Sequence, residues 1–289
     1  METIVLDQAH NLREFVRKSQ PAARVLAVTS GKGGVGKTNA SVNLAIALAA
    51  QHKRVIVLDA DLGLANVEVL LGLNSLYNLQ HVIDGEKSIM QILVKGPGGI
   101  ELVPGTSGLA RVADLNTAAR QNVLDGLREL QERSDFIIID TMAGIGQNAV
   151  RFAAAADEIL LVTTPEPSSI VDAYATIKAV ASIREDPIFR LIVNMVVNQQ
   201  QALAVTTNLA RVAKQYLGLT LSYLGYIPRD PHVSQGVMQS TPFVVGFPNA
   251  PATKCIHDLA AKLIRQRAET QSNKAGFFRR FAQTLGIAG

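Results

Sequence analysis

The sequence predicts an α/β fold in which helices flank a doubly wound, mostly parallel sheet. Apolar runs of strand length alternate with helical patterns along most of the chain, and the runs at residues 55–58 and 136–139 are apolar on both faces. Parallel strands that helices cover on both sides have this composition. A glycine-rich turn at residues 31–36 joins the first strand pattern to the first helical pattern. Ligands bind at such turns, outside the carboxyl ends of the strands.

The predicted elements follow one another in a regular order. Residues 1–20 have the pattern of a short amphipathic helix that ends before Pro21. Strands are expected at residues 24–30, 54–59, 100–103, 136–140, 158–163, 189–197 and 221–227. Helices are expected at residues 38–50, 117–132, 169–183, 202–216 and 253–267. A polar linker at residues 268–275 then separates a domain of residues 21–267 from a last basic and aromatic segment at residues 276–289.

Composition excludes several classes of protein. The 289 residues are 48% hydrophobic and 18% charged, which excludes a disordered chain, and the net charge of +4 is too small to predict nucleic-acid binding. Cys255 is the only cysteine, so neither a disulfide framework nor a multi-thiolate metal site can form within one chain. No signal-peptide pattern and no apolar run of membrane-spanning length is present. A reducing, cytoplasmic setting is therefore expected.

The glycine-rich turn matches two phosphate-binding patterns. Read as G-x-G-x-x-G, it is a dinucleotide loop, with Asp59 at a suitable distance to bind a ribose. Read as G-x-x-x-x-G-K-[ST], it is a P-loop, and this interpretation also explains why a lysine and a threonine follow the last glycine. Backbone N–H groups and side chains of the whole loop are expected to bind the phosphates: Gly31, Lys32, Gly33, Gly34, Val35, Gly36, Lys37, Thr38 and Asn39.

Carboxylates follow two of the predicted strands and complete a phosphoryl-transfer site. Asp59 ends one strand, Asp61 lies two residues further on, and Asp140 ends the apolar run at residues 136–139. Phosphoryl transfer needs groups that hold Mg²⁺ and a group that orients the attacking water. A carboxylate at the end of a buried strand is costly unless it is paired, and a hydrated Mg²⁺ is one such partner for Asp140.

These motifs together resemble the MinD/ParA class of P-loop ATPases, over roughly residues 25–264. Lys32 makes the loop similar to the deviant Walker A sequence K-G-G-x-G-K-T of that class. The resemblance implies ATP and Mg²⁺ as ligands, and a homodimer that sandwiches ATP, with Lys32 reaching the partner's phosphates. Lys32, Lys37 and Asp61 would act in slow ATP hydrolysis, Asp61 by positioning or deprotonating water. Mg²⁺ would be held by Thr38 directly and by Asp59 and Asp140 through water.

Further positions match the parts of this class that contact the base and sense the γ-phosphate. Asn194 ends an apolar strand and would read adenine with its amide, with Asn198 as a weaker candidate, while Glu166 would contact nucleotide across the dimer. Residues 141–146 resemble the switch loop, although Met142 replaces the usual small residue or proline. The segment that packs along the base is matched by Pro228, Arg229 and Asp230.

The end of the chain has the pattern of a short amphipathic helix. Four apolar residues fall on one helical face and two arginines lie beside it: Phe277, Phe278, Phe281 and Leu285 with Arg279 and Arg280. Such a helix can lie in the headgroup layer of an anionic membrane. It can equally dock on the domain core, and the two states can alternate.

The beginning of the chain resembles one group within this class. The residues Asp7, Gln8, Leu12 and Arg13 match D-Q-A-x-x-L-R, the N-terminal motif of flagellar number regulators (FlhG/FleN type). The resemblance implies that this segment stimulates a signal-recognition-particle-like flagellar GTPase, chiefly through Gln8. It also implies a σ54-type transcriptional activator and basal-body components as partners, and cycling between the cytoplasm and the inner membrane at the cell pole.

Two other functions remain open from the sequence. The chain can be a MinD/ParA-class ATPase for division-site placement or for DNA partition. It can also be a regulator that binds ATP without hydrolysing it and antagonises a transcription factor, which Met142 in the switch loop would suit.

Overall fold

The computed structural model describes residues 22–61, 66–105, 117–266 and 277–284. The strands are β1 (Arg24–Ser30), β2 (Val55–Ala60), β3 (Val94–Lys95), β4 (Glu101–Val103), β5 (Phe136–Ala143), β6 (Glu158–Thr163), β7 (Phe189–Val196) and β8 (Leu221–Pro228). The helices are α2 (Lys37–Ala49), α3 (Asn66–Leu71), α4 (Leu79–Ile83), α5 (Ile89–Ile92), α6 (Thr117–Arg133), α7 (Gln147–Ala155), α8 (Pro167–Ala181), α9 (Gln199–Leu217), α10 (Pro231–Met238), α11 (Phe243–Gly246), α12 (Pro251–Arg265) and α13 (Phe277–Thr284), with a 3₁₀ turn, η1 (Pro97–Gly99).

The strands form one eight-stranded sheet in the order β3-β4-β2-β5-β1-β6-β7-β8. Every neighbouring pair is parallel except β3 with β4. β1 lies inside the sheet, with β5, β2, β4 and β3 on one side of it and β6, β7 and β8 on the other, so the sheet is doubly wound as predicted. Such a sheet gathers the carboxyl ends of its parallel strands at one edge, where ligands bind.

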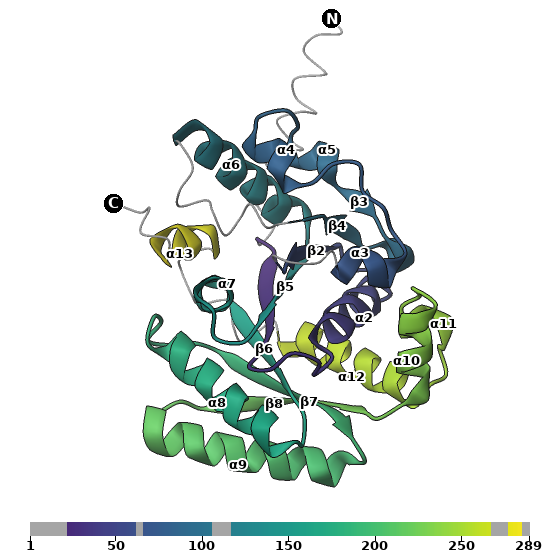
Figure 1. Cartoon of the computed structure of the whole chain (residues 1–289), viewed down its shortest axis with the longest axis vertical. Helices are drawn as coiled ribbons and strands as arrows, with labels where there is room; N and C mark the ends of the chain where they lie inside the picture. The colour runs from purple at the N-terminus through teal and green to yellow at the C-terminus, as the bar shows by residue number, and fades with distance from the viewer. Residues whose placement is uncertain (1–21, 62–65, 106–116, 267–276, 285–289) are drawn as a thin grey trace, which may run out of the picture.

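Helices cover both faces of the sheet and enclose two hydrophobic cores (Figure 1). One core packs α4, α5, α6, α7, α8, α9 and α13 against one face. The other packs α2, α3, α11 and α12 against the opposite face. The strand interiors of β1 and β5 contribute alternate residues to the two cores, which explains why their sequences are apolar throughout.

The predicted strands agree closely with the observed ones, with one informative difference. β5 continues three residues beyond Asp140, because Thr141 Oγ1 donates a hydrogen bond to Val28 O (3.0 Å) and Gly144 N donates to Ser30 O (2.8 Å). The first residues of the predicted switch loop are therefore held in the sheet. The structure also contains elements that the sequence did not predict: β3, which runs antiparallel to β4, and the short helices α3, α4, α5, α7, α10 and α11.

Buried ion pairs fix the edge of the sheet opposite the carboxyl ends. Glu158, fully buried at the start of β6, accepts hydrogen bonds from Arg24 on β1 and from Arg190 on β7. Arg24 also donates to Leu263 O (2.5 Å), near the end of α12. Because a buried carboxylate is tolerated only when it is paired, this cluster favours one relative position of three strands and α12.

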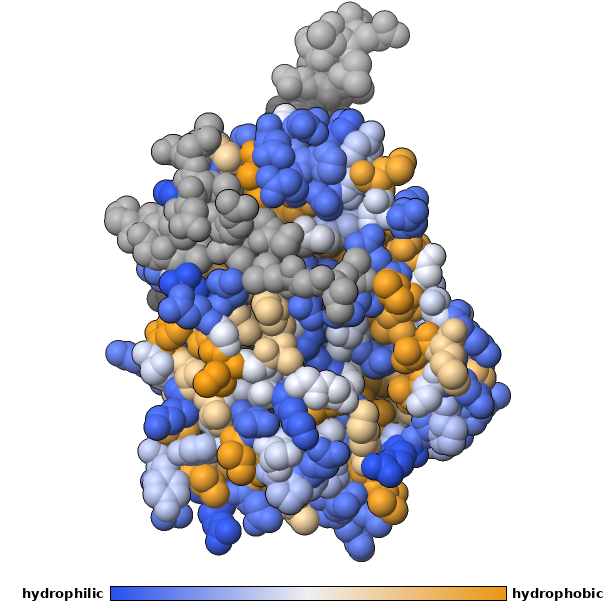
Figure 2. Space-filling view, viewed as in Figure 1, coloured by the Kyte–Doolittle hydropathy of each residue, from blue (hydrophilic) through white to orange (hydrophobic). Residues whose placement is uncertain are grey.

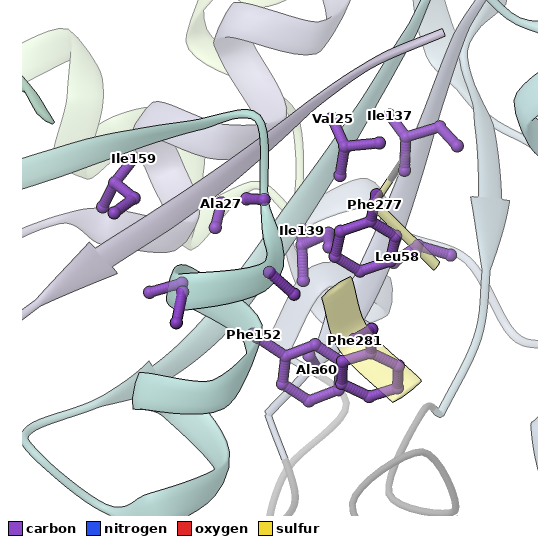
Figure 3. Packing of buried hydrophobic residues seen from close by; sticks show 14 of the residues in the cluster. Val25, Ala27, Leu58, Ala60, Ile137, Ile139, Phe152, Ile159, Phe277 and Phe281 are labelled. Carbon is purple, nitrogen blue, oxygen red and sulfur yellow. The ribbon is translucent and has the colours of Figure 1, made fainter. Parts of the chain in front are cut away.

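Helix α13 is docked on the domain and completes the first core (Figure 3). Phe277 and Phe281 are each 1% exposed, and the Phe281 ring stacks on Phe152 of α7 at a centroid distance of 4.9 Å. Arg280 Nε donates to Ala155 O (2.8 Å) at the end of α7, and its guanidinium forms an ion pair with Asp157. The structure therefore shows the docked one of the two predicted arrangements. The side chains of Phe278 and Arg279, and Leu285, lie outside the described residues.

The face of the molecule shown in Figure 2 is mixed rather than divided into polar and apolar halves. On the face shown in Figure 2, hydrophobic residues form small groups between hydrophilic ones. No helix among the described residues is long and apolar enough to cross a membrane.

Candidate functional site

The turn between β1 and α2 has the geometry of an anion-binding loop. Gly34 and Gly36 have φ angles of 78° and 85°, in the left-handed region that favours glycine. Gly36 is the N-cap of α2, the cap uses no side chain, and the first turn of α2 has no acidic residue. The N-terminus of α2 therefore presents its N–H groups and partial positive charge toward the cavity above it.

Two glycines of the turn are also required by close packing. A Cβ on Gly31 would lie 2.1 Å from Asp172 O of α8, and a Cβ on Gly36 would lie 2.3 Å from Asn194 Nδ2. Contacts this short are not possible without moving the backbone or the amide. The loop is therefore clamped between α8 and the end of β7, and the first and last glycines of its motif are the ones that permit this.

Asp140 organises the phosphate-binding residues. Its Oδ1 accepts hydrogen bonds from Lys37 Nζ (2.9 Å) and Ser41 Oγ (2.7 Å), and its Oδ2 accepts one from Thr38 Oγ1 (2.7 Å). Lys37, Ser41 and Asp140 are all buried. The structure thus joins the lysine and threonine of the loop to the carboxylate at the end of the apolar run in β5.

Asp59 lies beside Asp140 on the neighbouring strand, in register with it. Its Oδ1 accepts a hydrogen bond from Asp61 N (3.1 Å) and its Oδ2 accepts one from Val67 N (3.4 Å). Burial, followed by the charge of Asp140, raises the pKa of Asp59 from 3.8 to about 7. The two buried carboxylates thus have only one lysine nearby to balance their negative charge, as expected where a cation binds.

The donor chemistry of this corner fits Mg²⁺. The threonine hydroxyl and the two carboxylates provide oxygen atoms, which are the ligands that Mg²⁺ prefers, and Mg²⁺ usually keeps several waters. Within the described ranges, no group of three or more His, Cys, Asp or Glu residues could hold a metal ion. The residues that would hold Mg²⁺ are therefore Thr38, Asp59 and Asp140, together with nucleotide oxygens and water.

Asp61 lies at the rim of the cavity, where it can face a bound triphosphate. Its Oδ2 accepts a hydrogen bond from Asn66 Nδ2 (3.1 Å) at the start of α3. Asp61 and Asn66 both line the cavity beside the loop. Asn66 thus orients the carboxylate of Asp61, the residue that the sequence predicts to position the attacking water.

Lys32 is held on its own subunit in this structure. Its Nζ donates to Glu166 Oε2 (2.9 Å) and to Ser168 Oγ (3.0 Å) at the start of α8. The hydrogen bond, followed by the charge of Lys32, lowers the pKa of Glu166. Both side chains are exposed, Lys32 by 40% and Glu166 by 64%, so this ion pair can exchange for other partners.

Asn194 contacts the loop itself. Its Nδ2 donates to Val35 O (2.7 Å), and its Oδ1 accepts from Met195 N (2.8 Å). One amide N–H and one lone pair of Oδ1 are left for a base, so the amide keeps one donor and one acceptor, the pair that the sequence predicts for adenine. The weaker candidate, Asn198, is the N-cap of α9 and accepts from Gln201 N (2.9 Å).

The segment after β8 lines the cavity, but the carboxylate of Asp230 is engaged elsewhere. Asp230 caps α10 by accepting from His232 N (3.0 Å), and its other oxygen accepts from Ala252 N (3.0 Å) at the start of α12. Pro228 and Arg229 lie at the cavity wall, where backbone and side chain can flank a base. Asp230 is therefore placed at the site while its side chain links two helices.

Most of the phosphate loop, together with Asp61, Asn66, Asn194 and residues 228–230, lines one cavity of about 990 Å³ at the carboxyl ends of the strands. This is large enough for a nucleotide, since ligand pockets commonly have volumes of about 300–1,000 Å³. Apolar residues of α3, α10 and the end of β7 also line this cavity: Val69, Leu70, Met195, Val233, Val237 and Met238. The proposed GTPase-activating residues Asp7, Gln8, Leu12 and Arg13 lie outside the described residues.

Three residues of the site were missed in the sequence. Ser41 lies one helical turn after Lys37, and this spacing was an available signal. Asn66 and Ser168 act on Asp61 and Lys32 from the starts of α3 and α8, and no local pattern in the sequence marks them.

Comparisons with known proteins agree with this geometry. A family model described as ParA, NUBPL iron-transfer P-loop NTPase, matches residues 22–264. The chain is 39% identical to the antiactivator FleN of Pseudomonas aeruginosa, over 92% of this chain and 95% of that protein. It is 35% identical to the flagellum site-determining protein YlxH of Helicobacter pylori, over 91% of each. The MinD chain of an Aquifex aeolicus MinC:MinD cell division complex superposes with a TM-score of 0.68 at 28% identity, covering 88% of this chain and 100% of that one.

The phosphate loop, the carboxylates on β2 and β5 and the sheet order thus occur together with family similarity along most of the chain. They confirm the fold class and the resemblance inferred from the sequence. The chain belongs to the ParA/MinD family of P-loop NTPases.

Proposed function

We propose that this protein is an ATP-dependent switch that regulates the number or placement of flagella. The observation that carries the proposal is its similarity, over more than nine-tenths of its length, to both an antiactivator FleN and a flagellum site-determining YlxH. Site-determining MinD proteins of cell division are also related, at 31% identity for that of Bacillus subtilis. A function in positioning a structure in the cell suits both groups.

The ligand that we assign to the cavity is ATP with Mg²⁺. Lys37 would leave Asp140 for the β- and γ-phosphates, and Thr38 and the α2 N-terminus would hold the same end of the nucleotide. Mg²⁺, when bound, supplies positive charge that neutralises the phosphate oxygens. Asp61, oriented by Asn66, would position the attacking water, and hydrolysis would be slow and stimulated by partner or lipid.

ATP would drive formation of a homodimer in which Lys32 changes partners. In the present structure its ammonium group is bound to Glu166 and Ser168 of the same chain. Both contacts are at the surface and cost little to break. A triphosphate on a facing subunit would offer Lys32 a more highly charged partner, so dimerisation would depend on the γ-phosphate.

The C-terminal helix would alternate between the docked position and an anionic membrane. Docking buries Phe277 and Phe281, the same side chains that a membrane would receive. Each buried phenylalanine contributes about 1.5–3 kcal/mol in either place, so burial of the two rings does not by itself favour one of the two states. Two helices in a dimer would bind a membrane together and gain from their linkage. The protein would thereby cycle between the cytoplasm and the inner membrane, at the cell pole.

The partners that we propose are those of flagellar number regulators. They are a signal-recognition-particle-like GTPase that the segment with Asp7, Gln8, Leu12 and Arg13 would stimulate, a σ54-type transcriptional activator and components of the basal body. The Pseudomonas aeruginosa relative is named an antiactivator, which supports the transcriptional activator as a partner. Direct contact with nucleic acid is not part of the proposal.

The test is a count of flagella in cells of the source organism that lack this protein. We expect an altered number or position, restored by the wild-type gene and not by Lys37→Met. Unchanged flagella with altered septum position would favour division-site placement. A salt-sensitive shift of random duplex DNA would favour partition. Phosphate release that stays at background with lipid and partner present would favour an antagonist that binds ATP without hydrolysing it.

A further inference from the structure

Ser41 is a fully buried serine on α2 that contacts the carboxylate at the centre of the site. Its Oγ lies 2.7 Å from Asp140 Oδ1 and 3.1 Å from Lys37 O. The hydroxyl has one hydrogen and can donate to one acceptor at a time. A carboxylate is the stronger acceptor and gives shorter bonds, so the distances place the hydrogen on the contact to Asp140.

The need for this contact changes when nucleotide binds. In the present structure Oδ1 of Asp140 has two donors, Lys37 and Ser41. The lysine of a P-loop moves to the β- and γ-phosphates when these are present. After that step Ser41 is the donor that stays on Oδ1, while Thr38 stays on Oδ2.

The surroundings of Asp140 make a missing donor costly. Asp140 is 0% exposed, and Asp59 lies directly beside it in the sheet. A buried carboxylate that loses a donor is not compensated by bulk water. Another negative group at the neighbouring position raises the cost further.

We propose that Ser41 is a positioning residue that holds the carboxylate of Asp140 in place after Lys37 has left it for the phosphates. Ser41 does not line the cavity and acts through its contact with Asp140. Its contribution is largest when the lysine has left and no cation has replaced it. The inference rests on the proposed binding of ATP and Mg²⁺.

The experiment measures binding of a non-hydrolysable ATP analogue to the full chain by calorimetry, once in EDTA and once with Mg²⁺. We expect Ser41→Ala to weaken binding about 10-fold or more in EDTA, the loss typical of a hydrogen bond to a charged group. With Mg²⁺ present we expect about 3-fold or less, because the cation compensates Asp140. Equal weakening under both conditions would overturn the inference.

A matched control separates this effect from the loss of a buried hydroxyl as such. Ser134 is also buried and donates to the backbone oxygen four residues earlier, Leu130 O (2.7 Å), away from the site. We expect Ser134→Ala to leave both affinities unchanged. Should it weaken analogue binding as Ser41→Ala does, with the same dependence on Mg²⁺, the inference would be wrong.

A double-mutant cycle tests the route through Asp140. In an Asp140→Ala background, which removes the acceptor, Ser41→Ala should cause no further loss of affinity in EDTA, and a persisting loss would contradict the assignment. If Ser41→Ala does not fold, Ser41→Cys keeps the size with a weaker donor, and unchanged affinity in EDTA would then overturn the inference. Failure of the wild-type chain to bind the analogue in either buffer would instead overturn the proposed function.

Discussion

Lys37 and Asp140 form a buried ion pair in which Nζ and Oδ1 are 2.9 Å apart. One residue begins the helix after the phosphate loop and the other lies on the strand next to β1, so the pair ties the loop to the sheet. A triphosphate must compete with Asp140 for the lysine. Nucleotide binding therefore rearranges a contact on which the stability of the nucleotide-free protein depends.

The first prediction concerns this ion pair. Lys37→Met leaves Asp140 buried without its cation, and removal of one partner of a buried pair costs about 3–5 kcal/mol. We expect a loss of that size in the free energy of unfolding in urea, together with loss of ATP binding. The double variant Lys37→Met/Asp140→Asn should recover part of the stability and none of the binding. A stability of Lys37→Met equal to wild type would contradict the burial of the pair.

The second prediction concerns Asp61. Asp61→Ala removes the group at the cavity rim that Asn66 orients, so phosphate release should fall about 100-fold, as for loss of a catalytic base. ATP binding should remain, and light scattering should show an accumulated dimer with ATP. Asp84→Ala, on an exposed loop after α4, is the matched control and should behave as wild type. A variant that stays monomeric with ATP would contradict the dimer cycle.

The third prediction is a pH dependence due to Asp59. Its pKa is raised to about 7 in the folded protein, so the native state holds the proton better than the unfolded state. The contribution of this proton to the free energy of unfolding is present in full below about pH 4 and is lost as the pH rises through 7. In EDTA without nucleotide, Asp59→Asn should therefore be more stable than wild type by roughly 2–4 kcal/mol at pH 8, with a difference that shrinks toward pH 5. A difference independent of pH would contradict the assignment.

The fourth prediction concerns the docked helix. Asp157→Asn weakens the ion pair with Arg280 while the sequence of the C-terminal helix stays intact. We expect nucleotide-free protein to bind anionic vesicles more strongly than wild type in a co-sedimentation assay. Asp186→Asn, which changes the ion pair of Arg184 beside the same site, is the control and should leave sedimentation unchanged.

Removal of residues 276–289 should abolish sedimentation and leave ATP affinity intact. Vesicle binding that survives this truncation would refute membrane attachment by the helix.

The sheet could be predicted because its signal is local. An apolar run such as residues 136–139 marks a parallel strand by itself, and the phosphate loop fixes which ends of the strands form the site. β3 has two residues and therefore no periodicity to detect. The pairs of Glu158 with Arg24 and Arg190 join residues far apart in the chain. The partner of a polar residue in a strand cannot be predicted from the residues around it.

Individual roles were harder to predict than the identity of the site. For Asn194, the sequence predicted an amide that reads adenine, but it gave no sign that one N–H of this amide donates to the carbonyl of Val35 in the loop. For Phe277 and Phe281, one amphipathic pattern serves a membrane and a protein core equally, and only the position of Phe152 shows where the rings pack. Such contacts depend on the tertiary fold.

The most direct test of the account is calorimetric titration of the full chain with ATP, with and without Mg²⁺. We expect binding of one ATP per chain, tighter with Mg²⁺ than in EDTA and weaker for GTP, and no measurable heat for Lys37→Met. If the wild-type chain shows no binding of ATP with Mg²⁺, the cavity is not a nucleotide site and the proposed switch is wrong.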